Sequence, residues 1–509
     1  MPVQPPPVRA PILARRLCAF LFALLHALAA AAPQATARPG LPWLADDAAQ
    51  AKLAVRLLEQ AGAHGLEPER YGAADLARRL DMVRDAAAAA ALERDLGAAM
   101  LHYLRELHAG RTPSVYRAPD EADPLDPAPR LAEAVRAGRL QQLVDDAAPA
   151  IPLYRRVMAS LAHYRELARL HPAWPPLPAA TGAVAVGDSY PGTALLRERL
   201  HLLGDLDAGG AGGDRYTEAL AAALKRFQAR HGLAEDGVLG PQTLRALAVP
   251  LAHRAAQLAL TLERLRWLPP LPQGPTVIVN LPAYRLWAFD SSADAAAAPL
   301  EMRIIVGTAA RTPTPLFIGQ LRYLEVNPYW NLPRSITLHE ILPRLARDSA
   351  YLDENDMELV GAGGRVHLAP DAALAALRAG RVRIRQRPGA RNVLGHLKFA
   401  MPNPMDIYLH STSSKELFER SRRDLSHGCI RVERPIELAQ FVLADPQAWN
   451  AAAIEAAIRA GKTRTVTLRT PVPVVLFYAT AVTGRDGRIL FAEDIYGRDG
   501  PLLEALARP

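Results

Sequence analysis

The sequence predicts a multidomain α+β protein, in which a helical scaffold and a small three-helix bundle precede a mostly β domain of sandwich or barrel type. Three observations support this prediction. Apolar residues recur at helical spacing up to about residue 268, apolar and polar residues alternate from about residue 272, and a Pro-rich stretch divides the helical part. A chain of 509 residues is also long enough for about three domains.

The N-terminal segment has the pattern of an export signal. Arg9, Arg15 and Arg16 precede an apolar run over residues 17–32, and small residues at 35–37 offer a cleavage site. We therefore expect residues 1–37 to be a secretory signal peptide, or a signal anchor that tethers the protein to the membrane if it is not cleaved.

The net charge of +8 and the pI near 9.6 suit a polyanionic environment. The sequence has no compact Lys/Arg run with interleaved aromatic residues and no nucleic-acid-binding motif. We therefore favour an anionic cell envelope as the setting and expect no nucleic-acid partner.

The helical scaffold is expected over residues 43–170. Helical periodicity is clearest at residues 51–58, 96–107 and 151–170. The histidines of this segment have no ligand spacing, so we expect no catalytic cluster in it. Residues 171–185, whose first eight residues include four prolines, are expected to form a linker.

A compact helical unit is expected over residues 186–249. Amphipathic stretches at 195–200 and 220–228 are followed by Asp236-Gly237 and Gly240-Pro241, which favour tight turns. This order resembles the small peptidoglycan-binding module of bacterial wall enzymes, which implies a wall-binding role. Most of the apolar residues would also form the core of such a bundle, so the sequence does not assign ligand contacts.

The β domain is expected over residues 272–500. Strand patterns occur at residues 276–280, 284–289, 302–307, 321–326, 393–399, 465–468, 474–482 and 488–491. Residues 485–487 would form a hairpin turn, and a helix is expected over 435–443, with proline at its first turn.

Residues 336–385 interrupt the β pattern with helical stretches at 336–345 and 372–379. They form an insertion on the β domain, placed between its strands and the chemistry-bearing segment described next. Two interpretations remain open. The insertion acts as a cap over the site, or it is a loop excursion with a purely structural role.

The chemistry-bearing segment is Ser426-His427-Gly428-Cys429-Ile430-Arg431. Cys18 would leave with the signal, so Cys429 would be the sole thiol of the mature chain. A thiol with two nearby imidazoles has the components of a cysteine acyl-transfer site. His410 ends the alternating residues 407–410 and would meet Cys429 across a sheet, whereas His427 would share a side with Cys429 only if the segment is extended.

The residues around the thiol suggest how an oxyanion and a substrate would be held. Gly428 permits unusual dihedral angles, so the amides of residues 427–429 would converge on an oxyanion. Arg431 would bind a carboxylate of the substrate or of a neighbouring side chain.

Three alternatives apply to this segment. His410, His427 and Cys429 could hold zinc, but no fourth ligand stands at a suitable spacing, and we expect no metal. They could be inert core residues, although two histidines beside a buried cysteine would be unusual. Ser426 or Ser411 as nucleophile lacks a G-x-S-x-G context.

The motif segments resemble those of a known family. His410-Ser411 and residues 426–432 are similar to the signature of the L,D-transpeptidase (YkuD-type) catalytic domain. Residues 279–287, 327–333, 401–404 and 494–499, and the order of the domains, agree with the long multidomain Gram-negative subclass.

This resemblance implies a mechanism without a cofactor. Cys429 would attack the carbonyl between meso-diaminopimelate and the terminal D-Ala of a tetrapeptide stem. His410 would act as base and then acid, oriented by the carbonyl of Ser411. The amides of His427, Gly428 and Cys429 would form the oxyanion hole. The amine of a second stem would resolve the thioester and give a 3→3 cross-link.

The resemblance also implies a periplasmic location, donor and acceptor stems as partners, contact with other wall-synthesis enzymes, and acylation by carbapenem-type inhibitors. Tyr329, Trp330 and Arg431 are candidate substrate contacts, with ordinary packing as the alternative for the two aromatic residues. Two rival functions remain. One is an L,D-carboxypeptidase, in which water resolves the thioester, and the other is a non-catalytic wall-binding scaffold.

Overall fold

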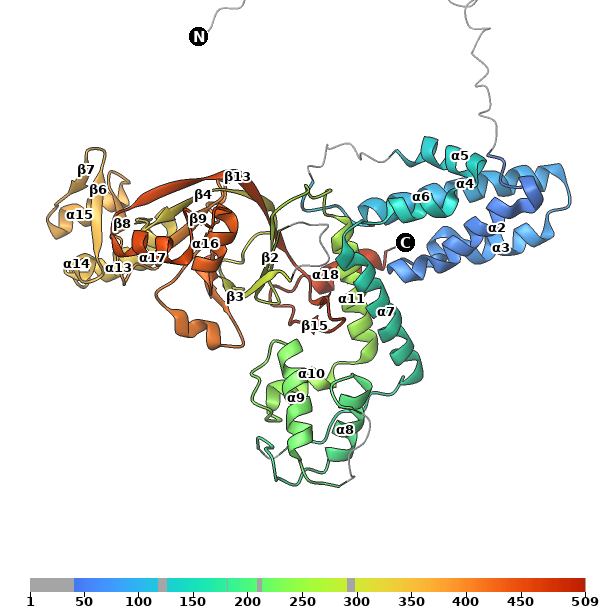
Figure 1. Ribbon diagram of the computed structural model, residues 1–509, viewed down its shortest axis with the longest axis horizontal. Coiled ribbons are helices and arrows are strands. Elements are labelled where there is room, and N and C mark those ends of the chain that lie inside the picture. Colours follow the sequence, from blue (N-terminus) through green and yellow to red (C-terminus); the bar gives the residue numbers. More distant parts are fainter. Residues whose placement is uncertain (1–40, 118–125, 181, 208–212, 291–297, 509) are drawn as a thin grey trace, which may run out of the picture.

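The computed structural model describes residues 41–117, 126–180, 182–207, 213–290 and 298–508. The segment expected to be a signal lies outside these residues. No helix in the described part of the chain is long and apolar enough to cross a membrane. Figure 1 shows a helical scaffold, a small helical module and a β-rich domain that meet around two long helices, α7 (Pro152–Leu170) and α11 (Leu251–Arg266). The predicted multidomain α+β architecture is confirmed.

The helical scaffold is built from five helices and two short 3₁₀ turns. They are α2 (Ala45–Glu59), η1 (Gln60–His64), η2 (Pro68–Tyr71), α3 (Ala73–Met82), α4 (Ala86–Ala109), α5 (Pro127–Ala137) and α6 (Leu140–Ala147). The carboxylates of Asp85 and Asp126 cap α4 and α5 by accepting backbone N–H groups of the first turn. Trp43 is fully buried among these helices, so the scaffold has a core of its own.

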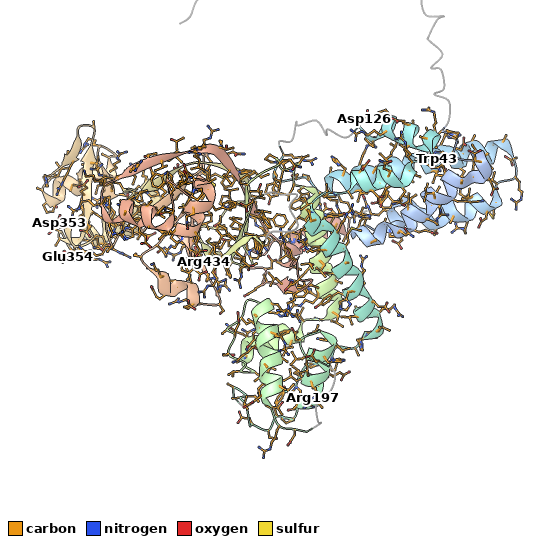
Figure 2. All side chains as sticks on the ribbon, viewed as in Figure 1. Trp43, Asp126, Arg197, Asp353, Glu354 and Arg434 are labelled. Atoms are coloured by element: carbon orange, nitrogen blue, oxygen red, sulfur yellow. The ribbon has the colours of Figure 1, made fainter. Side chains whose placement is uncertain are left out.

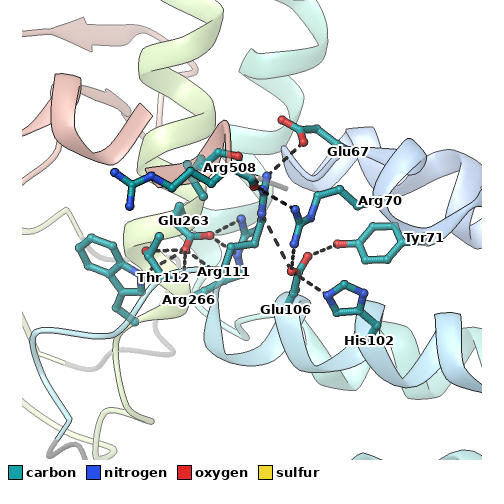
Figure 3. Close-up of polar contacts among 12 residues, drawn as sticks. Glu67, Arg70, Tyr71, His102, Glu106, Arg111, Thr112, Glu263, Arg266 and Arg508 are labelled. Carbon is teal, nitrogen blue, oxygen red and sulfur yellow. Dashed lines mark hydrogen bonds and ion pairs between the residues drawn. The ribbon is translucent and has the colours of Figure 1, made fainter. Parts of the chain in front are cut away.

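Two buried carboxylates lie where the scaffold meets α11 (Figure 3). Glu263 of α11 accepts the backbone amides of Arg111 and Thr112 at 2.7 and 2.9 Å, and it also pairs with Arg266 at 2.9 Å. Glu106 of α4 accepts the Tyr71 hydroxyl at 2.6 Å. A carboxylate removed from water is tolerated only when donors surround it. The bonds of Glu263 therefore tie the segment after α4 to α11, whereas the bond of Glu106 holds η2 against α4.

The small module contains α8 (Thr193–Leu202), α9 (Glu218–Arg230) and α10 (Pro241–Ala248). The buried side-chain amide of Gln228 holds the predicted turn, because it donates to Asp236 at 2.8 Å and accepts the amide of Gly237 at 2.8 Å. Glycine at 237 has a φ of +72°, a conformation that side chains disfavour.

The module packs against the β-rich part through aromatic rings. The imidazole of His231, at the end of α9, stacks on Phe227 at 3.8 Å between centroids, and its other neighbour is Phe491, at 5.5 Å. Phe491 lies in the hairpin formed by β14 (Ala481–Thr483) and β15 (Ile489–Phe491). The guanidinium of Arg254 covers Phe491 at 4.5 Å. The module is therefore attached by a packed interface.

The Pro-rich segment that precedes the module also lies against it. The indole of Trp174 donates to the carbonyl of Leu247 at 3.0 Å, and the guanidinium of Arg199 stacks over the same indole at 4.3 Å. Arg199 is itself buried and donates to two carbonyls.

The β domain is a closed barrel. Its strands are β1 (Thr276–Asn280), β2 (Arg285–Phe289), β3 (Leu300–Gly307), β4 (Ile318–Val326), β9 (Leu397–Ala400), β10 (Leu409–His410), β12 (Ile430–Val432) and β13 (Arg464–Phe477). They pair in the order β3-β12-β10-β9-β4-β13-β1-β2, and β2 pairs with β3 to close the ring; β11 (Asp424–Ser426) adds to β3 outside it. Of the two predicted forms, the barrel is thus the one observed.

Two helices cover the barrel, α16 (Pro435–Leu443), as predicted, and α17 (Ala451–Arg459). Their buried apolar residues join the barrel core. A last helix, α18 (Asp499–Leu506), packs against α11.

The prediction of one strand over residues 474–482 is wrong. The chain leaves β13 after Phe477 and begins β14 at Ala481. The side chain of Asn280 accounts for the break, because its amide pairs with the backbone N–H and C=O of Ala479 at 2.9 Å each. The side chain of Asn280 thus makes the hydrogen bonds that a further residue of β1 would have made with β13.

The insertion has its own small sheet. The strands β5 (Trp330–Asn331), β6 (Met357–Gly361), β7 (Gly364–Val366) and β8 (Arg383–Gln386) pair in the order β5-β8-β6-β7. Helical segments α12 (Arg334–Ile336), η3 (Thr337–Ile341), α13 (Leu342–Leu345), α14 (Tyr351–Glu354) and α15 (Pro370–Arg378) pack with it around a separate core. The two predicted helical stretches are present, whereas the sheet was not predicted.

Candidate active site

Two short parallel strands bring His410 to the motif that contains Cys429. β10 pairs with β12 so that Leu409 is opposite Ile430 and His410 is opposite Arg431. The amide of Ile430 donates to the carbonyl of Tyr408 at 3.1 Å, which extends this pairing toward the cysteine. His410 thus lies on the strand beside the one that Cys429 precedes.

The imidazole of His410 is fixed in one tautomer. Its Nδ1 lies 2.5 Å from the backbone carbonyl of Ser411. Because a carbonyl only accepts, Nδ1 carries the hydrogen, and Nε2 of the neutral ring is left as a proton acceptor. Burial lowers the pKa of His410 to about 3, helped by the positive charge of Arg431 and opposed by the carbonyls of Ser411 and Leu394. The ring is therefore neutral at physiological pH.

The hydroxyl of Ser411 has a structural task. It donates to the carbonyl of Leu394 at 2.9 Å and accepts the amide of Leu397 at 3.0 Å. Gly395 makes room for it, since a Cβ at 395 would lie 2.3 Å from this oxygen. The loop before β9 is thereby locked to the residue whose carbonyl orients His410.

The thiol of Cys429 is half-buried. Its Sγ donates to the carbonyl of Asp406 at 3.5 Å. Burial raises the pKa of the Cys429 thiol, and contacts with Tyr408 and the charge of Lys398 only partly oppose this. The resting site therefore pairs a protonated thiol with a neutral imidazole, and the thiol needs a base to become a nucleophile.

The motif is bent at Gly428, whose φ is +114°. The extended segment that would have put His427 beside Cys429 is therefore not formed, because this glycine turns the chain. The imidazole of His427 instead reaches the insertion, where its Nε2 lies 2.7 Å from Oε1 of Glu340 on η3.

Three threonines that sequence reasoning missed hold the bent motif. Thr314 is fully buried, and its hydroxyl donates to the carbonyl of Gly428 at 2.8 Å. The amide of Thr308 and the hydroxyl of Thr312 both donate to the carbonyl of Ser426, at 2.9 and 3.2 Å.

The three threonines and Gly307 form a clamp on the motif. The glycine at 307 was the sequence feature that could have pointed to this clamp. A Cβ on Gly307 would lie 1.9 Å from the carbonyl oxygen of Thr312 and 2.9 Å from Cα of Gly428. The Tyr496 hydroxyl donates to the Gly307 carbonyl at 2.7 Å. The loop of residues 307–314 thus lies directly against the motif, far from it in sequence.

Comparison with known families now assigns this domain. Residues 274–474 match the family model described as the L,D-transpeptidase catalytic domain (YkuD). The chain carries an L,D-transpeptidase domain. Residues 189–247 match a putative peptidoglycan-binding domain, and residues 38–161 match a scaffold domain.

The L,D-transpeptidase assignment agrees with a curated relative, a putative L,D-transpeptidase of Haemophilus influenzae. The two chains are 33% identical over 273 residues, which is 52% of this chain and 54% of the relative. This chain therefore spans about half the length of the curated relative it matches.

Two solved L,D-transpeptidase structures also match. One, from Stackebrandtia nassauensis, is 14% identical with a TM-score of 0.23, covering 60% of this chain and 97% of that chain. The other, from Xylanimonas cellulosilytica, is 16% identical with a TM-score of 0.18, covering 59% and 100%. At these TM-scores neither structure supports a conclusion about this chain.

Arg431 of the L,D-transpeptidase domain is a half-buried cation. Its Nε is shielded from solvent without a hydrogen-bond partner, and the guanidinium makes no ion pair within the described ranges. Burial lowers the pKa of Arg431. Such a cation beside His410 is suited to receive an anionic group.

The two aromatic candidates have packing roles in this structure. The ring of Tyr329 lies under the guanidinium of Arg385 at 4.1 Å. Trp330 is partly buried against the core of the insertion. Both residues thus connect the L,D-transpeptidase barrel to the insertion.

A shallow cleft of about 460 Å³ lies beside the start of the motif, lined by Arg420, Ser421, Arg422, Asp424 and Leu425. Over the described residues, no cluster of three or more His, Cys, Asp or Glu side chains is arranged to hold a metal ion.

Proposed function

We propose that this chain is a peptidoglycan L,D-transpeptidase that forms 3→3 cross-links between diaminopimelate residues through a thioester on Cys429, with release of D-Ala. One observation carries the proposal. His410 is buried, neutral and held by the Ser411 carbonyl, so that Nε2 remains as a proton acceptor on the strand beside Cys429.

Acylation would begin with proton transfer from Sγ of Cys429 to Nε2 of His410. The sulfur attacks the carbonyl of the diaminopimelate–D-Ala bond, and the amides of residues 427–429 stabilise the oxyanion. One such donor is typically worth about 10²–10³ in rate. The imidazolium then gives its proton to the leaving amine, D-Ala departs, and the thioester remains.

The thioester would be resolved by the side-chain amine of a second stem. The new C–N bond replaces the C–S bond, so one acyl bond is exchanged for another and no external energy source is needed. Water in place of the amine would give L,D-carboxypeptidase activity with the same thioester.

Arg431 is proposed to bind a substrate carboxylate. Its positive charge lowers the pKa of His410, so an anion placed on the guanidinium would offset that effect and raise the pKa again. The base would then strengthen when the donor is bound.

The setting proposed for this reaction is the periplasm. Residues 1–37 would be the export signal, residues 43–170 the scaffold, residues 186–249 the wall-binding module, and residues 272–500 the catalytic domain with its cap. Donor and acceptor tetrapeptide stems would be the partners, and carbapenem-type inhibitors would acylate Cys429. Contact with other wall-synthesis enzymes stays a prediction.

The decisive experiment incubates the mature enzyme with purified disaccharide-tetrapeptides and reads the products by mass spectrometry. A dimer that lacks one D-Ala supports the transpeptidase, tripeptide alone indicates the carboxypeptidase, and unchanged substrate indicates a non-catalytic scaffold. Cys429→Ala should abolish both reactions.

A matched pair of histidine variants tests the base. His410→Gln should lose activity, whereas His396→Gln should keep it, because His396 faces Asn327 with Nδ1 3.3 Å from Oδ1 and is outside the proposed mechanism. Full turnover by His410→Gln would contradict the assignment of His410.

A further inference from the structure

We propose that Glu340, on the insertion, is a specificity-determining residue for the acceptor. This inference rests on the proposed function. The carboxylate would gather the acceptor's ammonium group at the thioester, and would thereby favour cross-linking over hydrolysis.

The position of Glu340 relative to the motif is the first argument. Its Oε1 lies 2.7 Å from Nε2 of His427, two residues before Cys429 in the chain, although 87 positions separate the bonded residues. A carboxylate only accepts, so His427 carries its hydrogen on Nε2. The insertion therefore supplies a negative charge to the wall of the site, and this charge does not come from the barrel.

The exposure of Glu340 is the second argument. The side chain is 40% exposed, and that of His427 is 52% exposed. Within the described residues, Oε2 of Glu340 takes part in no hydrogen bond or ion pair. Oε1 is thus bonded to His427 of the motif, whereas Oε2 is free to accept a hydrogen bond from an ammonium group.

The distribution of charge around the site is the third argument. Arg431 and Lys398 place positive charge near His410, and both lower the pKa of that imidazole. Glu340 places negative charge at His427, on the other arm of the motif. Both stems carry carboxylates and a diaminopimelate amine, but the acceptor reacts through its amine, so a negative charge on the side of His427 would favour the reacting group of the acceptor.

One cation that interacts electrostatically with Glu340 lies on the same insertion. Arg344 senses the charge of Glu340, but its guanidinium donates to the hydroxyl of Tyr351 at 2.9 Å and covers the tyrosine ring. It makes no ion pair with Glu340 in the described structure, so the carboxylate is not neutralised.

The step that Glu340 would favour is attack of the acceptor amine on the thioester. The acceptor's ammonium, held at the carboxylate, gives one proton to water and becomes a neutral amine. The amine attacks the thioester carbonyl and forms a C–N bond. Its second proton passes to Nε2 of His410 as the C–S bond breaks, and the imidazolium then protonates the thiolate of Cys429. The net products are the cross-link, the free thiol and one released proton.

The test uses the mature enzyme and Glu340→Gln, which keeps the shape of the side chain and removes its charge. The readout is the fraction of released D-Ala that appears as dimer and not as tripeptide. We expect this fraction to fall about fivefold or more at low ionic strength, with a smaller difference at high salt. Glu354→Gln is the matched control, because Glu354 lies on α14 at the outer end of the insertion (Figure 2) and should keep the wild-type fraction.

Two results would overturn the inference. One is an unchanged fraction in Glu340→Gln while the wild type cross-links. The other is a proportional loss of both products, which would mean that Glu340 acts only on acylation, through His427. Glu340→Asp, which keeps the charge, should restore part of the dimer. If the wild-type enzyme releases no D-Ala, it is the proposed function that fails.

Discussion

The hydroxyl of Thr314 donates to the carbonyl of Gly428 at 2.8 Å while it accepts the amide of Gly307 at 2.9 Å. A peptide group is planar, so fixing the carbonyl of Gly428 also fixes the direction of the N–H of Cys429. If the N–H of Cys429 stabilises the oxyanion, Thr314 orients this N–H without itself contacting the substrate.

Thr314→Val should therefore impair catalysis more than binding. The variant keeps the volume and loses both hydrogen bonds, so we expect kcat for D-Ala release to fall about 10- to 100-fold with a smaller change in KM. An unsatisfied buried carbonyl should also cost about 1–3 kcal/mol of stability. Steady-state kinetics well below the unfolding temperature separate the two effects. The exposed Thr465→Val is the control, and wild-type kcat in Thr314→Val would refute the role.

Gly307→Ala should be strongly destabilising. The added Cβ would lie 1.9 Å from a backbone oxygen of Thr312, which cannot move without displacing the clamp on the motif. We expect a loss of about 3 kcal/mol or more, seen as a lower Tm in thermal denaturation. Gly363→Ala should be nearly neutral, because the space around that position is open. A small change in Tm for Gly307→Ala would show that the loop of residues 307–314 can move away from the added methyl group at little cost.

Arg431→Gln should raise the pKa of His410. Burial and the charge of Arg431 both lower this pKa, to about 3, so removing the cation favours the protonated ring. NMR titration of the His410 imidazole should show the rise, and His396 in the same spectra serves as reference. Activity should nevertheless fall, because the proposed carboxylate contact is lost. An unchanged or lowered His410 pKa would contradict the electrostatic argument.

Glu106→Gln should reduce the acid sensitivity of the helical scaffold. Burial opposes ionisation of Glu106, but hydrogen bonds from Tyr71 and Arg70 outweigh it and hold the pKa of this carboxyl below its ordinary value. A depressed carboxylate pKa contributes stability that is present above the unfolded value and is lost as the pH falls through the folded value.

We therefore expect Glu106→Gln to lower Tm at pH 7 by removing about 1–3 kcal/mol, with a smaller difference from wild type below pH 4. Thermal denaturation across pH 3–7 measures this. Glu69→Gln, at an exposed position nearby, should follow the wild-type curve. A Tm difference between wild type and Glu106→Gln that stays constant from pH 3 to pH 7 would exclude a contribution from the ionisation of Glu106.

Much of the fold was predictable because local patterns carried it. The strand over residues 276–280 and the helix over residues 435–443 appear with the predicted bounds. The sheet of the insertion was missed because its strands are short and β8 alternates arginine with Ile384 and Gln386, which resembles a charged loop. The choice between sandwich and barrel depended on the pairing of β2 with β3, a contact that no local pattern encodes.

The candidate site was predictable only where the motif itself was involved. Spacing in the sequence pointed to Cys429 and His410, which remain predictions as catalytic residues. It did not reveal Thr314 or Glu340, which the tertiary fold brings to the motif from distant segments, a loop for Thr314 and the helical segment η3 for Glu340. The sequence left open whether His427 lies on the same side as Cys429, because that depended on an extended backbone, and Gly428 takes a φ of +114°.

The stacked rings of Phe227, His231 and Phe491 have a consequence for how the enzyme would work along a wall. A binding module on a loose tether lets its catalytic partner sweep a wide radius around one attachment point. Here Trp174 of the Pro-rich segment bonds to the module, and the module packs on the hairpin of β14 and β15, so under the proposed function the distance between the wall-binding module and Cys429 would be fixed. Such an enzyme would form cross-links at a fixed distance from the glycan strand to which its module binds.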